Sequence, residues 1–312
     1  MRCIRLWVSE PEVRAMILSD SKFYAEESAK ELAELWVVGH RHVICQDFIS
    51  GCLVKTIVSL ATGETHIEHR SLVAQGIRLI TLKHAFFKKY LDSIKSTSQL
   101  AIYHLLHYCR AGQVTHYQGK VSLELRVRGR EVNKLKIGLI GLGRVGSHIA
   151  AALSGLGCEG VTFYDPLVMF GESQQSKLGI SLVKASSVEE VLNACDIVFL
   201  AANERADKLP ILDHEVAVRV SSIVSIINIA RASLVSPEFL YSLANRNLLG
   251  FFGTDVFWDE ANCLKSEQIL DQLASKLVPI SVSPHIGGFT TDALVVLGDA
   301  LWKFLEIEYQ NE

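Results

Sequence analysis

The stretch 136–157 of the 312-residue chain reads KIGLIGLGRVGSHIAAALSGLG. Its first part, KIGLIG (136–141), is a short apolar run with the length of a buried strand, and SHIAAALSGLG (147–157) has apolar residues at helical spacing. Between them lies the pattern GxGxxG, made by Gly141, Gly143 and Gly146. A strand, a glycine-rich turn and a helix in this order predict the first unit of an open α/β sheet.

Further apolar runs rich in Val and Ile follow this stretch and alternate with helical patterns. Near-continuous apolar strands separated by helices indicate a parallel sheet that is covered on both faces. The second half of the chain therefore predicts a doubly wound α/β domain, the Rossmann architecture. The expected strands are VTFYD (161–165), DIVFLAA (196–202), SIVSIIN (222–228), GFFGTDVF (250–257) and VPISVSP (278–284).

The first part of the chain predicts a second, smaller α/β domain of the flavodoxin-like kind. SIKSTSQLAIYHLLHYCR (93–110) is expected to be a long helix that leads into the sheet domain, and residues 291–309 a helix that packs back on the first domain. We therefore expect one domain of residues 1–110, completed by 289–312, and a second of residues 111–288. The expected strands of the first domain are VRAMILS (13–19), LWVVGHRHVIC (35–45), LVKTIVSLA (53–61) and GIRLITL (76–82), with a helix at SAKELAEL (28–35).

Composition limits the classes of function. Hydrophobic residues make up 49% of the chain and charged residues 21%, which supports a large buried core. The 31 basic and 34 acidic residues nearly cancel, giving a net charge of −3, so we expect neither a nucleic-acid partner nor a membrane surface. The chain shows no apolar run long enough for a signal peptide or a membrane span, and its seven cysteines form no CxxC pair. A cytoplasmic protein without a metal site is expected.

The glycine pattern points to a dinucleotide. Glycines at these positions allow a tight turn, a close approach of the backbone to a pyrophosphate, and close packing of helix on strand. The next strand ends in Asp165, 24 residues after Gly141, where a carboxylate can bind the ribose hydroxyls of the adenosine. A 2′-phosphate would be repelled there, so NAD is favoured over NADP. The alternative is an ordinary glycine-rich turn beside a solvated aspartate.

Three of the later strands are followed by charged residues. Arg231 comes after SIVSIIN, Glu260 after GFFGTDVF and His285 after VPISVSP. Because ligands of open α/β sheets bind outside the carboxyl ends of the strands, we expect the three side chains to lie near one another. An arginine can hold a carboxylate, a histidine can exchange a proton with a carbonyl oxygen, and a glutamate can orient the imidazole. Taken singly, each could instead be an ordinary surface or core residue.

Five segments together resemble the D-isomer-specific 2-hydroxyacid dehydrogenases: GLIGLGRVG, YDP, INIARASLV, GTDVFWDE and SPHIGG. The resemblance covers about residues 50 to 300. It implies hydride transfer between NAD and C2 of a small D-2-hydroxy or 2-keto acid, and a homodimer built around the 93–110 helix and the arm QGKVSLELRVRG (118–129). It further implies catalytic roles for Arg231, Glu260 and His285, and substrate contacts from Thr62 and Gly63 in the loop Ala61-Thr62-Gly63. The implied cofactor contacts are Gly141, Gly143, Arg144, Val145, Gly146, Asp165, Ala230 and Asp255.

Two other functions remain open at this stage. Some relatives of this family act as NADH-sensing transcriptional corepressors, and a nucleotide-binding enzyme of another chemistry, such as a methyltransferase, is a third possibility. The chain also departs from the family pattern, with Ala232 in place of a usual glycine and Thr65 in place of a usual aspartate. His104 and His107 are expected to be packing or surface residues. Trp258 is expected to line the substrate pocket, with a cover over the sheet edge as the alternative.

Overall fold

The chain folds into two compact units. Unit 1 consists of Met1–Ile94 and Phe289–Glu312, and unit 2 consists of Lys95–Gly288. The computed structural model describes residues 2–7, 11–18, 23–25, 33–39, 43–64, 66–110, 127–168, 178–205, 207–260 and 262–309.

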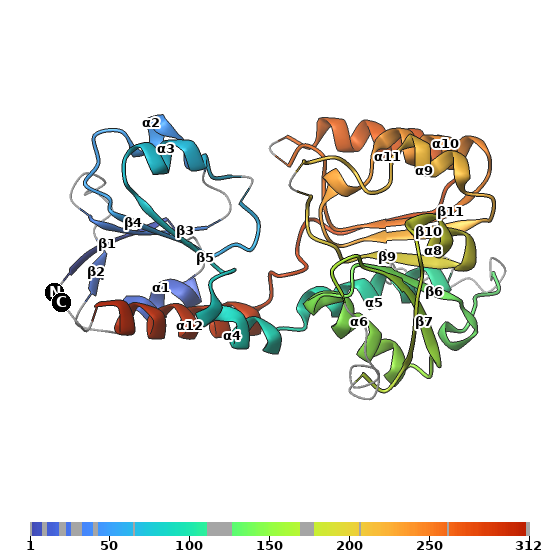
Figure 1. The fold of residues 1–312 in the computed structure, drawn as a ribbon, viewed down its shortest axis with the longest axis horizontal. Helices are drawn as coiled ribbons and strands as arrows, with labels where there is room; N and C mark the ends of the chain where they lie inside the picture. The colour runs from blue at the N-terminus through green and yellow to red at the C-terminus, as the bar shows by residue number, and fades with distance from the viewer. Residues whose placement is uncertain are drawn as a thin grey trace, which may run out of the picture. The chain divides into compact units, whose positions relative to one another are not determined.

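The described strands of unit 1 form one parallel sheet with the order β2-β1-β3-β4-β5 (Figure 1). This order is that of flavodoxin-like folds, as the sequence predicts for this part of the chain. The strands are β1 (Arg2–Trp7), β2 (Phe23–Ala25), β3 (Leu35–Val38), β4 (Thr56–Ser59) and β5 (Arg78–Thr81).

Helices cover both faces of this sheet (Figure 1). Strand β3 shows how the sequence produces this layering, because successive side chains of a strand point to opposite faces. Leu35 and Val37 belong to the core beneath α1 and α12, whereas Trp36 and Val38 belong to the core beneath α2 and α3. The helical segments are α1 (Pro11–Leu18), α2 (Gln46–Ile49), α3 (His69–Ala74), η1 (Ala85–Phe87), α4 (Lys88–Ser93) and α12 (Thr291–Tyr309).

The N-terminal part of unit 1 differs from the sequence-based prediction. Residues 13–19 were expected to form a strand, but Pro11–Leu18 is the helix α1. Val13 and Ile17 are buried, four residues apart on one face of this helix. A short apolar run fits both a strand and a buried helix, and here packing against α12 selects the helix. Strands β1 and β2 were not predicted, and most of the predicted helix 28–35 lies outside the described residues.

The described strands of unit 2 also form a parallel sheet, in the order β12-β11-β10-β9-β6-β7-β8. Counted from β6, this is the doubly wound order 3-2-1-4-5-6 with one more strand at the edge, which confirms the predicted fold class. The order reverses between β6 and β9, where ligands of such sheets bind. The strands are β6 (Ile137–Ile140), β7 (Gly160–Tyr164), β8 (Ser181–Lys184), β9 (Ile197–Leu200), β10 (Val224–Asn228), β11 (Leu249–Thr254) and β12 (Ile280–Val282).

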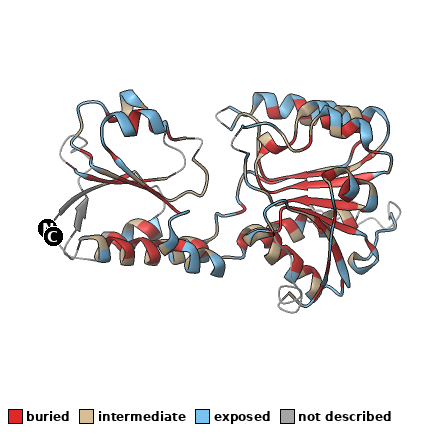
Figure 2. Cartoon of the chain, viewed as in Figure 1, coloured by how far each residue is buried: buried red, intermediate tan, exposed pale blue. Residues whose placement is uncertain are grey.

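The sheet of unit 2 is a buried layer, as Figure 2 shows. Strand β9 again faces two cores: Ile197 and Phe199 pack with α5 and α6, and Val198 and Leu200 pack with the helices of the other face. The helical segments are α5 (Ser96–Cys109), η2 (Val132–Lys134), α6 (Arg144–Gly155), α8 (Val188–Ala194), α9 (His214–Arg219), η3 (Ala232–Leu234), α10 (Pro237–Asn245) and α11 (Leu264–Ser275).

The boundary between the units lies earlier than the sequence suggests. The division predicted at residue 110 assigned the helix 93–110 to the first domain, whereas the structure places α5 in unit 2. The reason is packing: α5 lies against α6 and the strands β10, β11 and β12, and Ala101 and Leu105 are fully buried in that core. The predicted helix 291–309 is present as α12 and belongs to unit 1.

Candidate active site

The glycine loop joins β6 to α6 at the point where the strand order reverses. Gly141 has a φ of 95°, and a Cβ atom there would lie 2.7 Å from the backbone nitrogen of Ala202. A Cβ atom on Gly146 would lie 2.3 Å from the carbonyl oxygen of Gly141. A side chain at either position would force the backbone to shift, because the first glycine makes the turn and the second packs the helix against that turn.

Gly143 differs from the other two glycines. It is exposed, and a Cβ atom built on it would have no atom within 4 Å. It is also the N-cap of α6 and provides no side-chain cap, while the first backbone N–H groups of a helix have no partner inside it. An open backbone at the positive end of a helix dipole is what a pyrophosphate requires, so these residues fit NAD. Arg144 and Val145 form the first turn of α6 and are half-buried.

Asp165 ties the next strand to this loop. Its Oδ2 accepts a hydrogen bond from the backbone nitrogen of Leu142 at 2.8 Å, and its Oδ1 accepts one from Leu167 at 2.9 Å. Each carboxylate oxygen can accept a further hydrogen bond, and the residue is only half-buried. The structure therefore places this carboxylate beside the glycine loop, where the sequence predicts the ribose to bind.

Glu260 and His285 lie in direct contact at the carboxyl edge of the sheet. Glu260 follows β11 and His285 follows β12, and Nδ1 of His285 lies 2.7 Å from Oε1 of Glu260. Their side chains are 46% and 36% exposed, so both can be reached by a ligand. Burial acts to raise the pKa of Glu260, but the hydrogen bond from His285 and the attraction of His285 and Arg231 outweigh it. The pKa of Glu260 consequently lies below its usual value.

Arg231 follows β10 at the same edge. Asn228, the last residue of that strand, shapes the turn: its Nδ2 donates to the carbonyl oxygen of Arg231 at 2.9 Å, and its Oδ1 accepts from the backbone of Ala230 at 3.1 Å. One guanidinium nitrogen donates to the carbonyl oxygen of Ala230 at 2.6 Å. Ala232 begins η3 without a positive φ, so alanine fits where the family usually has glycine. Asn228 was not predicted, although a polar residue ending a buried strand is a usable signal.

His285 has an unusual backbone conformation, with a φ of 54°. For a residue other than glycine, this left-handed region costs about 1–3 kcal/mol and persists only where the surroundings enforce it. Asp255 supplies that enforcement: its Oδ1 accepts from the backbone of Ile286 at 2.9 Å and its Oδ2 from that of Gly287 at 2.8 Å. Asp255 is 2% exposed, and its predicted contact with the cofactor stays a prediction.

The predicted substrate loop belongs to unit 1. Thr62 and Gly63 follow β4 and are half-buried, and their contact with substrate stays a prediction. The next residue, Glu64, anchors the loop: it forms an ion pair with Lys83 at 3.0 Å, and its Oε2 lies 3.2 Å from Nε2 of His69. Glu64 was not predicted from the sequence. Thr65, where the family usually has aspartate, lies outside the described residues.

Trp258 is half-buried and packs on the core of unit 2, and its predicted place in the substrate pocket stays a prediction. Its indole nitrogen donates to the carbonyl oxygen of Val235 at 2.9 Å, and its ring stacks on Phe252. These contacts fix the indole ring at the edge of that core. His104 is fully buried, as expected for a packing residue.

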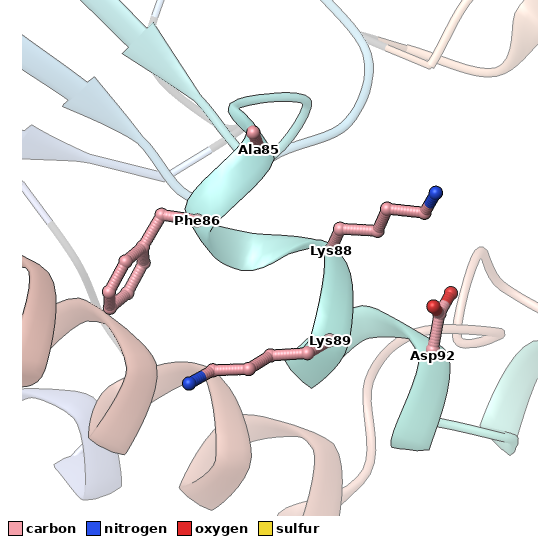
Figure 3. A pocket seen from close by; sticks show the side chains of 5 residues that line it. All are labelled: Ala85, Phe86, Lys88, Lys89 and Asp92. Atoms are coloured by element: carbon pink, nitrogen blue, oxygen red, sulfur yellow. The ribbon is translucent and has the colours of Figure 1, made fainter.

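None of the predicted site residues lines the hollow found on the surface of unit 1. This hollow of about 420 Å³ is lined by residues of η1 and α4, with Lys89 close to Phe86 (Figure 3).

In the described part of the chain, no helix combines the length and apolarity needed to span a bilayer. Among the same residues, no group of three or more His, Cys, Asp or Glu side chains could hold a metal ion. Residues 118–126 of the predicted dimer arm lie outside the described ranges.

A match to a known protein family covers most of unit 2. Residues 100–287 match the family described as D-isomer specific 2-hydroxyacid dehydrogenase, NAD binding domain. A D-3-phosphoglycerate dehydrogenase of Mycobacterium leprae is 28% identical over 244 residues, which are 77% of this chain and 42% of that protein. An aromatic 2-oxoacid reductase of Clostridium sporogenes is 26% identical over 174 residues, 53% of this chain and 50% of that protein. The chain thus spans half the length of these relatives or less.

Solved structures share the fold over the whole chain. A D-lactate dehydrogenase from Aquifex aeolicus, complexed with NAD and lactic acid, matches with a TM-score of 0.75 and 20% identity, covering 99% of this chain and 96% of that one. The D-lactate dehydrogenase of Escherichia coli matches with a TM-score of 0.75 and 16% identity, covering 99% and 98%. At this level of identity the likeness concerns the fold.

Proposed function

The chain belongs to the family of D-isomer specific 2-hydroxyacid dehydrogenases, and from this we propose that it transfers a hydride between NAD(H) and C2 of a small D-2-hydroxy acid or the corresponding 2-keto acid. The contact of 2.7 Å between His285 and Glu260 carries the proposal. It lies at the sheet edge that also holds Arg231, in the unit that contains the glycine loop.

His285 is the proposed general acid and base. Because its Nδ1 contacts Glu260, the proton exchanged with the substrate oxygen is assigned to Nε2. NADH, when bound, would supply the hydride to C2. In the direction of reduction, Nε2 of His285 donates this proton to the carbonyl oxygen. In the direction of oxidation, Nε2 accepts the proton of the hydroxyl group.

Glu260 orients the imidazole and stabilises its charged form. A carboxylate that contacts Nδ1 holds the ring in one tautomer and compensates the positive charge that develops when Nε2 takes a proton. The lowered pKa of Glu260 matters here, because it keeps the carboxyl group ionised over the pH range in which a histidine can exchange protons.

Arg231 is the proposed partner of the substrate carboxylate. A guanidinium stays charged and offers a planar fork of donors that matches a carboxylate in two hydrogen bonds. One of its nitrogens is already bound to the carbonyl oxygen of Ala230, which holds the group in place. Following the family resemblance, backbone amides of Thr62 and Gly63 also bind the substrate carboxylate.

The cofactor contacts are proposed as the sequence predicted them. The backbone around Gly143 receives the pyrophosphate, and Asp165 binds the adenosine ribose and disfavours NADP. A homodimer formed around α5 is proposed on the family resemblance. A nucleotide-binding enzyme of another chemistry, such as a methyltransferase, would require the segments INIAR (227–231) and PHIGG (284–288) to lie away from the crevice at the carboxyl ends of the strands. It is disfavoured, because Arg231 and His285 follow β10 and β12 at that edge.

The decisive experiment is a panel of 2-keto acids with NADH, followed by loss of absorbance of the reduced nicotinamide. The panel includes pyruvate, phenylpyruvate, hydroxypyruvate and a phosphorylated keto acid, and the product of any active substrate is resolved into its D and L forms. We expect turnover of at least one acid and a D product. Tight NADH binding without turnover of any acid would instead support the NADH-sensing scaffold.

A further inference from the structure

A chain of buried hydrogen bonds runs from α5 to the loop that carries His285. His104 on α5 is fully buried, and both nitrogens of its ring have partners on or next to β12. Nδ1 lies 2.8 Å from Oγ of Ser281, and Nε2 lies 3.0 Å from Oγ of Ser283. Ser283 in turn donates to Oδ1 of Asp255 at 2.6 Å.

The chemistry of these groups decides which group donates and which accepts in each of these hydrogen bonds. A serine hydroxyl has one hydrogen, and Ser283 uses it toward Asp255, so Ser283 must accept the hydrogen bond from Nε2 of His104. Nε2 of His104 therefore carries the proton. Burial is the main cause that lowers the pKa of His104, to about 4; nearby Asp255 partly opposes it, and His107 adds to it. The ring is consequently neutral near pH 7, and its unprotonated Nδ1 accepts from Ser281.

The row of hydrogen bonds from His104 ends at the backbone beside His285. The Asp255 carboxylate accepts the N–H groups of Ile286 and Gly287, the two residues after the histidine. The approach is close, since a Cβ atom on Gly287 would lie 2.8 Å from Oδ2 of Asp255. Thr97, at the start of α5, donates to the carbonyl oxygen of Gly287 at 3.1 Å. Both α5 and β12 thus converge on the turn that holds His285 in its left-handed conformation.

We propose that His104 is a positioning residue for His285: through Ser283 it orients the carboxylate of Asp255, which holds the backbone of the 285–287 loop. The catalytic part of this inference rests on the proposed role of His285, but the mechanical part does not. Without the donor at Nε2, the Ser283 hydroxyl loses the partner that directs its hydrogen toward Asp255. The carboxylate then loses one of its three fixed hydrogen bonds, and the loop gains freedom.

Amide hydrogen exchange, followed by NMR with assigned amide signals, tests the mechanical part of the inference, which is the hold of Asp255 on the 285–287 loop. We expect His104→Leu, which fills the space without a donor, and Ser283→Ala to speed exchange at Ile286 and Gly287 by about tenfold, the effect of losing one hydrogen bond to a charged group. Exchange at the buried strand β6 should stay unchanged, which separates a local effect from a general loss of stability. The matched control is His107→Leu on the same helix, where the ring contacts Tyr103 and Phe251 instead.

Kinetics of the same variants test the catalytic part. His104→Leu should lower kcat about tenfold while the KM for NADH changes little, and His104→Gln, whose amide can still donate to Ser283, should restore most of kcat. The double variant His104→Leu/Ser283→Ala should be no slower than Ser283→Ala alone, because both changes break one chain.

The outcomes separate this inference from the proposed function. Unchanged exchange at Ile286 and Gly287 in His104→Leu, or equal changes in His107→Leu, would overturn the positioning role. Faster exchange at the loop with unchanged kcat would overturn its catalytic part. If the wild-type protein turned over no keto acid while the loop exchange responded as expected, the proposed function would fail and the mechanical link would stand.

Discussion

Nδ1 of His285 lies 2.7 Å from Oε1 of Glu260, and this contact joins residues that follow two different strands. The carboxylate of Glu260 orients the imidazole ring. The carboxylate of Asp255 holds the backbone after His285, because it accepts the N–H groups of the next two residues. Two acidic groups therefore set the place of one histidine, one through its ring and one through its loop.

Replacement of His285 should remove the proton transfer and spare the cofactor. We expect His285→Ala to lower kcat about 100-fold or more with nearly unchanged NADH affinity, measured by steady-state kinetics and by NADH fluorescence titration. His285→Asn is the matched control for the backbone, because asparagine tolerates the left-handed conformation at this position. An equal loss in both variants assigns the effect to the imidazole, and full turnover in either would place the acid and base elsewhere.

Arg231→Lys should weaken binding of the substrate carboxylate. Lysine keeps the charge but lacks the planar fork that makes two parallel hydrogen bonds, so kcat/KM for the keto acid should fall at least about tenfold. NADH affinity is expected to stay the same. A comparison with a substrate analogue that has an amide in place of the carboxylate provides the check: wild type and variant should differ much less on the amide. Equal losses on both would argue against this role of Arg231.

Substitution by alanine should affect stability at one glycine of the loop between β6 and α6 and NADH affinity at another. Gly146→Ala would place a Cβ atom 2.3 Å from a backbone oxygen, so we expect a loss of about 1–3 kcal/mol in the free energy of unfolding. Gly143→Ala meets no atom within 4 Å, so its Tm should equal that of the wild type while NADH affinity falls roughly tenfold or more. Unchanged NADH affinity in Gly143→Ala would mean that the pyrophosphate does not lie on this loop.

Asp165→Ala should narrow the preference for NAD over NADP. The variant loses the carboxylate that binds ribose hydroxyls and repels a 2′-phosphate, so the ratio of kcat/KM values with NADH and NADPH should move toward one. Because Asp165 also accepts the N–H groups of Leu142 and Leu167, Asp165→Asn serves as the control that retains an acceptor. A wild-type protein that already prefers NADPH would contradict the assignment.

The buried His104 predicts a loss of stability in mild acid. Its folded-state pKa of about 4 lies below the unfolded value of 6.5, so between these values the unfolded chain binds more protons. The free energy of unfolding therefore falls as the pH is lowered through this window, by roughly 3 kcal/mol in total. Urea unfolding of the wild type and of His104→Leu at pH 7 and pH 4.5 measures this. Between pH 7 and pH 4.5, the free energy of unfolding should fall more in the wild type than in the variant, which lacks the titrating imidazole. Parallel behaviour of the two proteins would show that His104 is not the group responsible.

Several features could be read directly from the sequence because they depend on local order. The strand, glycine turn and helix at 136–157 specify one another, and the alternation of apolar runs with helices predicts the doubly wound sheet. Because the carboxyl ends of parallel strands share one edge, the order of elements also placed Arg231, Glu260 and His285 together. The segment 13–19 shows the limit, since its apolar spacing fitted a strand and packing against α12 decided for α1.

The sequence by itself determined the class of fold, the glycine loop between β6 and α6 and the set of residues at one sheet edge, because these follow from periodicity and from strand order. Only the tertiary structure decided the contacts that depend on side chains from distant elements. The link from His104 through Ser283 to Asp255 joins α5 to the ends of β11 and β12, and no spacing along the chain encodes it. Such links arise because a buried polar group must find a partner wherever packing places one.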